Sequence, residues 1–271
     1  MLPFPEMKDS TLALNDHVAI LTLARDDLRN ALTGTELVSD IVNTVEWVNR
    51  CEEVAVMVLT GAGSAFSAGG NIKEMQSRQG IFAGSAIEIE QSYRQGIQRM
   101  TLAMGRAEVP IVAAVNGPAI GAGFDLACMC DLRIASDNAI IGETFINLGI
   151  IPGDGGAWYL QRLVGYQRAA ELTLSGRLVK AEEALALGLF LEVVAPEQLM
   201  SRTLELAAQL AAKPRQALRM TKRLLRMARD HELDDVLQTS ASFQGMLHQT
   251  EDHMEAVNAF IEKRTARFCG R

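Results

Sequence analysis

The sequence predicts an α/β protein that ends in a helical region. Three observations lead to this fold class. Short apolar runs rich in β-branched residues have the length of buried strands, and segments with a helical apolar period separate them. After Pro196 no strand pattern recurs. We therefore expect an α/β core over residues 1–196 and a helical region over residues 197–271.

The strands of the core are predicted from continuous apolar runs, which are typical of strands buried on both faces. Between the first two runs, residues 33–50 place Leu37, Ile41 and Val45 on one helical face, so the order is strand, helix, strand. Small residues predict a further helix over 122–130. The predicted strands are 18–23, 54–59, 111–115, 132–135, 139–142 and 190–194.

The helical region contains amphipathic segments, whose apolar faces must be buried against the core or against another subunit. Residues 213–229 carry seven Lys or Arg residues and no acid. This run favours a solvated helix face, and a surface that contacts phosphate or a neighbouring subunit is the alternative.

Composition narrows the function classes. The chain has 271 residues, of which 48% are hydrophobic, and its formal net charge is -7, which argues against nucleic acid as a partner. Four cysteines are too few for a disulfide framework, and no spacing typical of a metal site occurs. The N-terminus carries no targeting signal, and no apolar run is long enough to span a membrane. We expect a cytoplasmic protein that binds neither metal nor membrane.

Two strands lead into turns of small residues, 59–75 and 114–126. Neither turn has the third glycine of a dinucleotide fingerprint or the Gly-Lys-Ser/Thr of a phosphate loop. Where Cβ atoms are few, a ligand can approach the main chain, and N–H groups at a helix start can stabilise an oxyanion. A tight turn without any binding role is the alternative for either one.

Four segments carry a resemblance to a known family. They are the Leu-Thr-Gly-x-Gly run that leads to residues 66–72, the strand 113–117 that leads to Gly121-Ala122-Gly123, the run 130–135, and residues 148–156. In this order they resemble the crotonase superfamily, the enoyl-CoA hydratase/isomerase family, over about residues 15–265. The resemblance implies a spiral of β-β-α units, followed by helices that build a trimer, commonly paired into a hexamer.

The resemblance also implies a reaction. Members of this family hold the carbonyl oxygen of an acyl-CoA thioester on two backbone N–H groups while an enolate forms. By position, these donors would be the amides of Ala68 and Ala122, and Ala122 stands where the family usually has glycine. Coenzyme A is then part of the substrate and no other cofactor is implied. The substrate-binding residues implied are Ser64, Phe66, Ala68, Gly69, Gly70, Asn71, Ile72, Gly121 and Phe145.

Hydratases of the family resemble one another in two glutamates that transfer protons. The first falls on Asp125 and the second on Phe145, which cannot transfer a proton. Asp154 is a possible substitute, and a cap on the helix expected over 157–164 is the equal alternative. Glu143 is a third candidate, which would reach the pocket only if the local turn differs from that of the family.

We therefore expect an enoyl-CoA hydratase/isomerase-type enzyme with Asp125 and Asp154 as acid/base residues. Two alternatives stay open. One is a double-bond isomerase without hydratase activity, because moving one proton needs fewer poised groups than activating water. The other is a non-catalytic protein that binds CoA esters.

Overall fold

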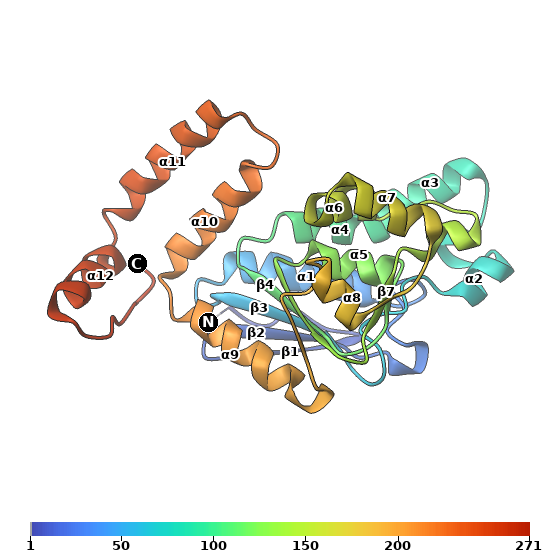
Figure 1. The fold of residues 1–271 in the computed structure, drawn as a ribbon, viewed down its shortest axis with the longest axis horizontal. Helices are drawn as coiled ribbons and strands as arrows, with labels where there is room; N and C mark the ends of the chain where they lie inside the picture. Colours follow the sequence, from blue (N-terminus) through green and yellow to red (C-terminus); the bar gives the residue numbers. More distant parts are fainter. Residues whose placement is uncertain (1) are drawn as a thin grey trace.

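The computed structural model describes residues 2–271 (Figure 1). Its main sheet has six strands in the order β1-β2-β3-β4-β6-β9, and all neighbours except β1 and β2 run parallel. The predicted α/β architecture is confirmed. The six strands are β1 (Ser10–Asn15), β2 (Val18–Leu23), β3 (Val56–Gly61), β4 (Ile111–Val115), β6 (Leu132–Ser136) and β9 (Glu192–Val194).

The strands that are buried on both faces agree best with the sequence. β2 and β4 have the predicted bounds, and every residue of β3 is buried, although β3 begins two residues later than predicted. β1 was not predicted. Its side chains alternate between more and less buried positions, as expected for an edge strand that pairs only with β2.

Helices cover both faces of the sheet (Figure 1). On one face, α1 packs against α4, α4 against α5, and α5 against α6, around the larger apolar core. The helices are α1 (Leu37–Arg50), α2 (Ile72–Ser77), α3 (Ala86–Gln95), α4 (Ile97–Gly105), α5 (Ala122–Met129), α6 (Gly156–Val164), α7 (Tyr166–Ser175), α8 (Ala181–Ala186), α9 (Leu199–Ala211), α10 (Arg215–Met227), α11 (Leu233–Leu247) and α12 (Glu251–Glu262).

The opposite face of the sheet is covered by α9, which packs on β2, β3, β4 and β6. Leu199 and Ala207 of this helix join a second apolar cluster with Val56, Val58 and Val112 of the strands. By contacts, α9 therefore belongs with the core, although it lies beyond residue 196. The division of the chain at residue 196 stays a prediction, and the helices that extend away from the core are α11 and α12 (Figure 1).

The basic run of residues 213–229 anchors α10 to the core. Arg219 donates to the carbonyl oxygens of Val48 and Cys51, at the C-terminal end of α1, at 2.8 and 2.9 Å. Lys222 Nζ bonds the Asp131 carboxylate at 2.7 Å. The Arg219 guanidinium suits the end of α1 because the last carbonyls of a helix carry partial negative charge. The expected solvated face is therefore wrong for these two side chains, which are half-buried or more.

A small second sheet positions the loops that matter for function. It contains β5 (Ala119–Ile120), β7 (Ile140–Gly142) and β8 (Val179–Lys180) in the order β5-β7-β8. Four short 3-10 helices complete the described chain: η1 (Asp26–Leu28), η2 (Gly80–Phe82), η3 (Thr144–Leu148) and η4 (Pro196–Gln198). In the part of the chain that the structure describes, no helix has the length and apolarity needed to cross a membrane.

Candidate active site

The turn between β4 and α5, residues 116–121, ends in an unusual backbone conformation. Gly121 has φ of 53°, a left-handed value that favours glycine, and its N–H donates to the Gly142 carbonyl at 2.8 Å. Helix α5 begins at the next residue, Ala122. The first N–H groups of a helix have no partner within it, and the Ala122 N–H has no acceptor among the described residues. This amide is therefore available to a ligand, and its role as an oxyanion donor stays a prediction.

The turn between β3 and α2, residues 62–71, corrects one prediction. The Ala68 N–H donates to the Arg29 carbonyl at 2.9 Å, so it is used within the fold and cannot be the expected donor to a ligand. Two residues later, the Gly70 N–H has no acceptor among the described residues. Gly70 therefore replaces Ala68 as the candidate donor of this turn.

Gly69 brings the two turns together. A Cβ on Gly69 would lie 2.4 Å from the Ile120 carbonyl oxygen and 3.0 Å from the Ala122 nitrogen, so a larger residue would push the turns apart. Gly69 also has φ of 79°. The Ile120 N–H donates to the Ser67 carbonyl at 3.0 Å and fixes the contact. The amides of Gly70 and Ala122 thus lie on adjoining segments, as an oxyanion hole requires.

Three carboxyl side chains lie together behind the second turn. Asp125 lies in the first turn of α5, Glu143 follows β7, and Asp154 comes shortly before α6. Their exposed fractions are 0%, 1% and 2%. No lysine, arginine or histidine of the described chain forms an ion pair or hydrogen bond with any of them. The structure therefore brings Asp125 and Asp154 together, as predicted, and adds Glu143 to them.

This burial disfavours the ionised form of each acid. Burial, and then the charge of Glu143, raise the pKa of Asp125 well above its usual value. Burial raises the pKa of Glu143 to about 7. Burial and the charge of Asp125 also raise the pKa of Asp154. Groups with such perturbed pKa values beside free backbone donors are candidates for proton transfer at neutral pH.

The predicted helix cap is formed by a different acid. The N-cap residue of α6 is Gly155, and the Asp154 side chain makes no bond to the helix start. Asp125 Oδ2 instead accepts the N–H of Gly156 at 3.0 Å. The Thr101 hydroxyl donates to the Asp154 backbone carbonyl. The capping interpretation of Asp154 is therefore wrong, and its carboxyl group is left to a role in the site.

Phe145 lies beside the second turn. Its ring atom Cζ is 3.5 Å from the place that a Cβ would take on Gly121, and the side chain is 9% exposed. An apolar ring therefore occupies the surroundings of the Ala122 amide.

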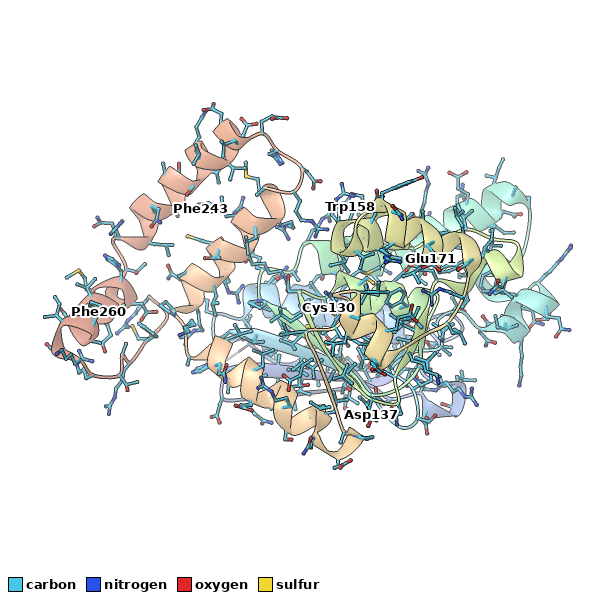
Figure 2. All side chains as sticks on the ribbon, viewed as in Figure 1. Cys130, Asp137, Trp158, Glu171, Phe243 and Phe260 are labelled. Carbon is cyan, nitrogen blue, oxygen red and sulfur yellow. The ribbon has the colours of Figure 1, made fainter. Side chains whose placement is uncertain are left out.

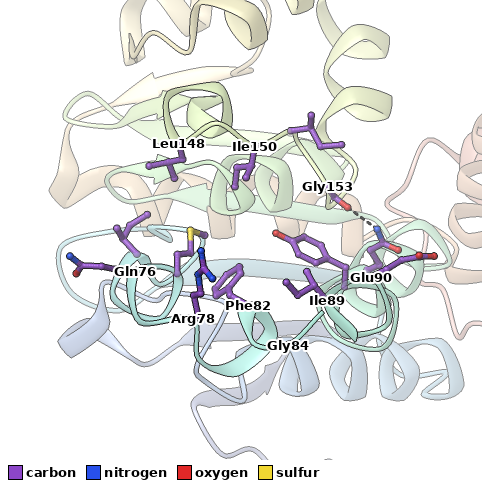
Figure 3. Close-up of a pocket in the computed structure, with 14 residues that line it drawn as sticks. Gln76, Arg78, Phe82, Gly84, Ile89, Glu90, Leu148, Ile150 and Gly153 are labelled. Carbon is purple, nitrogen blue, oxygen red and sulfur yellow. Dashed lines mark hydrogen bonds between the residues drawn. The ribbon is translucent and has the colours of Figure 1, made fainter. Parts of the chain in front are cut away.

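An apolar pocket of about 940 Å³ opens next to this site (Figure 3). Ile150 and Gly153 line one wall, and residues of α2, η2 and α3 line the other. Gly153 precedes Asp154, so the loop that carries this acid also forms part of the pocket wall. Its lining residues are Ile72, Met75, Gln76, Arg78, Phe82, Gly84, Ile89, Glu90, Tyr93, Gln98, Leu148, Ile150, Ile151 and Gly153.

Tyr93 of this pocket was not predicted from the sequence. A Cβ on Gly153 would lie 3.0 Å from its ring, and burial together with the Asp154 charge raises the pKa of its phenol. Gln98 Nε2 donates to the Gly153 carbonyl at 2.8 Å and holds the same loop. Both side chains come from α3 and α4, helices that lie outside the motifs on which the sequence prediction of the site rests.

The remaining predicted binding residues have different surroundings. Ser64 is exposed and bonds the Asp26 carboxylate, and Ile72 is exposed at the pocket. Phe66 is completely buried in the core, so its side chain cannot touch a ligand in the structure. The Asn71 side chain accepts the Lys73 N–H and caps α2. The described residues contain no group of three or more His, Cys, Asp or Glu side chains placed to hold a metal ion.

The fold and site define a class: an α/β protein with unpaired backbone amides on adjoining turns, a buried cluster of acids behind them and an apolar pocket nearby. Residues 13–271 match the family model described as enoyl-CoA hydratase/isomerase. The chain belongs to this family, and the resemblance seen in the sequence is confirmed.

Relatives and solved structures agree over nearly the full length. The short-chain-enoyl-CoA hydratase of Clostridium acetobutylicum is 34% identical over 96% of this chain and 97% of its own length. The crotonyl-CoA hydratase of Syntrophomonas wolfei is 35% identical over 96% and 97%. A crystal structure of a putative enoyl-CoA hydratase from Streptomyces coelicolor superimposes with a TM-score of 0.91 at 32% identity, covering 100% of this chain and 98% of that one. The predicted crotonase-type fold is confirmed.

Proposed function

We propose that this protein is an enoyl-CoA hydratase, which adds water to the carbon–carbon double bond of an enoyl thioester of coenzyme A. One observation carries the proposal: two unpaired backbone amides, those of Gly70 and Ala122, lie on adjoining turns, with buried acids behind the second. The names of the full-length relatives support the same chemistry.

The two amides would bind the thioester carbonyl oxygen. As a nucleophile attacks Cβ, electrons of the double bond move toward this oxygen and an enolate develops. Fixed N–H donors stabilise that charge, and one such donor typically contributes about 10²–10³ in rate. The N-terminal end of α5, which starts at Ala122, adds a favourable dipole. No redox or metal cofactor enters this reaction, and coenzyme A is part of the substrate.

Asp125 and Asp154 would exchange protons with water and with the substrate. The carboxylate of Asp125 takes one proton from water as the new C–O bond forms at Cβ. The carboxylic acid of Asp154 gives one proton to Cα as the enolate collapses. Asp125 then has one proton more and Asp154 one fewer, so a proton must pass between them before the next turnover. Their raised pKa values suit this exchange near neutral pH.

Double-bond isomerisation is a second candidate function, favoured by Phe145. The ring beside Gly121 fills space where the family's hydratases carry an acid, and it makes the surroundings of the substrate less favourable for water. Isomerisation needs one group that removes a proton from one carbon and returns it to another, which Asp125 or Asp154 could do alone.

Spectroscopy separates these functions. Hydration of crotonyl-CoA removes the absorbance of the conjugated thioester, and isomerisation of a 3-enoyl-CoA creates it. We expect the first change above the rate without enzyme. A gain with the 3-enoyl substrate and no loss with crotonyl-CoA would establish the isomerase. Binding of acetyl-CoA in calorimetry without either absorbance change would favour a non-catalytic protein that binds CoA esters. Tighter binding of NAD than of acetyl-CoA would overturn the assignment of CoA thioesters as the ligands.

Assembly into a homotrimer or homohexamer is part of the proposal. Helices α11 and α12 extend from the core and carry Phe243 and Phe260, respectively (Figures 1 and 2), and Phe260 is 85% exposed. Leu233, Leu237 and Ile261 of the same helices are also exposed. A surface of this kind is stabilised when another subunit covers it. Light scattering should therefore detect a trimer or larger, and a folded monomer at micromolar concentration would contradict this.

The unpaired state of the cysteines in the described residues agrees with a location in the cytoplasm, which is a reducing compartment. Cys51, Cys128 and Cys130 are buried and unpaired, and Cys269 is exposed and unpaired. Labelling with a thiol reagent after unfolding should modify all four.

A further inference from the structure

Glu143 occupies a position that the expected mechanism does not use. It follows β7 directly and is 1% exposed, and neither of its carboxyl oxygens has a hydrogen-bond donor outside the acid cluster. A buried carboxylate with no cation and no N–H donor is very costly. Either Glu143 carries a proton itself, or its carboxylate accepts a hydrogen bond from a protonated neighbouring acid.

The neighbouring acid is Asp125. A Cβ on Gly156 would lie 2.1 Å from Asp125 Oδ1 and 2.5 Å from Glu143 Oε1, so the two oxygens meet over the same α-carbon. The two side chains are within hydrogen-bond reach of each other. A hydrogen bond between two carboxyl groups requires one proton, because two carboxylates would only repel each other.

The other contacts of the two acids show where a negative charge on the pair is supported. Asp125 Oδ2 accepts the Gly156 N–H at 3.0 Å at the start of α6, whereas neither oxygen of Glu143 accepts an N–H. The Gly156 N–H therefore supports a negative charge on Asp125 whenever the shared proton lies on Glu143. The other titratable groups that interact with the pair are Asp154 on the loop before α6 and Cys128 on α5, and neither supplies a positive charge.

We propose that Glu143 is a positioning residue that shares one proton with Asp125, so that the pair enters the reaction as one carboxylic acid and one carboxylate. The inference deepens the proposed function, on which its kinetic consequences rest. Proton sharing is balanced within the pair: the O–H bond of one carboxyl group breaks as that of the other forms, and the total charge stays at one negative unit.

This assignment gives the site a second acid from a different position. The family's second glutamate falls on Phe145, but Glu143 puts a carboxyl group directly against Asp125. When Asp125 has taken a proton during turnover, both members of the pair are neutral. The next proton transfer, to Asp154, restores the single charge.

Infrared difference spectroscopy tests the shared proton without any substrate. A protonated carboxyl group absorbs as a carbonyl, in a region free of carboxylate bands, when the protein is measured in D₂O. We expect the wild type to keep such a band at pH 6 to 7, and Glu143→Gln and Asp125→Asn each to reduce it. Glu143→Asp, which can restore the pair, should retain it. Because this measurement needs no turnover, it decides the inference even if the enzyme proves inactive on every enoyl-CoA.

The pH dependence of kcat/KM tests the effect on Asp125. In Glu143→Gln only Asp125 can ionise, so the second ionisation of the pair, which would place two negative charges side by side, should disappear from the alkaline side of the profile. Glu143→Asp should keep the wild-type profile. Two results would overturn the proposal: no protonated-carboxyl band in the wild type at pH 6 to 7, or a Glu143→Gln profile that falls equally at every pH.

Discussion

The two small-residue turns look alike in sequence but present their backbones differently. Both follow a buried strand and lead toward a helix. In the second turn, α5 starts right after Gly121, so the first amide of the helix, that of Ala122, is unpaired. In the first turn, α2 starts only at Ile72, and the chain uses the Ala68 amide to bind Arg29.

A motif of this kind therefore locates a turn and does not identify which of its N–H groups is free. The amide that remains available is the one that no other part of the chain bonds, and Arg29, far from the motif in sequence, decides this for Ala68. The turns also differ in their acids. Asp125 of α5 lies in the carboxyl cluster, whereas the first turn contributes none of the three acids.

The largest effect is expected from removal of the acid attached to the second turn. Asp125→Asn keeps the side-chain volume and removes the base, so kcat should fall by about 10²–10⁴ with a modest change in KM. Asp154→Asn should have an effect in the same range. Asp137→Asn, at an exposed position outside the cluster, is the control and should leave kcat unchanged. Full activity of Asp154→Asn would leave Asp125 as the only proton-transfer residue.

Backbone esters test the donors of the two turns directly. Replacing Ala122 by lactic acid through an α-hydroxy-acid codon removes its N–H and keeps its methyl group, and kcat should fall by about 10²–10³. The same exchange at Ala68 removes only the bond to Arg29. It should lower the free energy of unfolding by about 0.5–1.5 kcal/mol and leave kcat unchanged. A larger kinetic loss at 68 than at 122 would reverse the assignment of the donors.

The acids behind the second turn should make stability depend on pH. The folded protein holds a proton on Glu143 up to about pH 7, whereas the unfolded chain loses it near the ordinary value of 4.5. Folding stability should therefore fall as pH rises between these values, by about 3 kcal/mol for this group. Chemical denaturation at several pH values measures the slope. Glu143→Gln should flatten it, and an unchanged slope would show that Glu143 is not the titrating group.

The smallest effect concerns the choice between the two reactions. Phe145→Glu adds an acid beside the second turn and should raise the ratio of hydration to isomerisation by about tenfold. Parallel assays with crotonyl-CoA and a 3-enoyl-CoA give this ratio. Phe145→Gln, which is polar but cannot donate a proton in the same way, is the matched control. An equal change in both variants would attribute the effect to polarity rather than to acid catalysis.

The parts of the fold that the sequence predicted are those with a local signal. The predicted bounds of β2 and β4 are correct because their residues are almost all apolar and fully or mostly buried. β1 was missed because an edge strand with half-buried side chains has a weaker pattern. The place of α9 was missed for another reason: an amphipathic helix has one apolar face, and the sequence does not say which surface covers it.

The residues of the candidate site, like the elements of the fold, could be predicted only where the sequence carries a local motif. Asp125, Asp154 and the Ala122 amide could be proposed from the sequence because motif positions carry them, and their roles stay predictions. Glu143 was ranked behind them because it stands two residues from the family's position, and only the fold brings it to Asp125 over the bare α-carbon of Gly156. Long-range contacts of this kind have no signature in the order of residues along the chain.

The packing of α9 sets a condition on how the protein is made. This helix alone, among α1 to α9, covers the face of the sheet that contains Val56, Val58 and Val112, and it is synthesised after all six strands. Until residue 211 has left the ribosome, the nascent chain exposes that apolar face and its parallel strands can pair incorrectly. Chains released before this point should aggregate or be held by chaperones. The packing of α9 is therefore the step that commits the newly made chain to its native sheet.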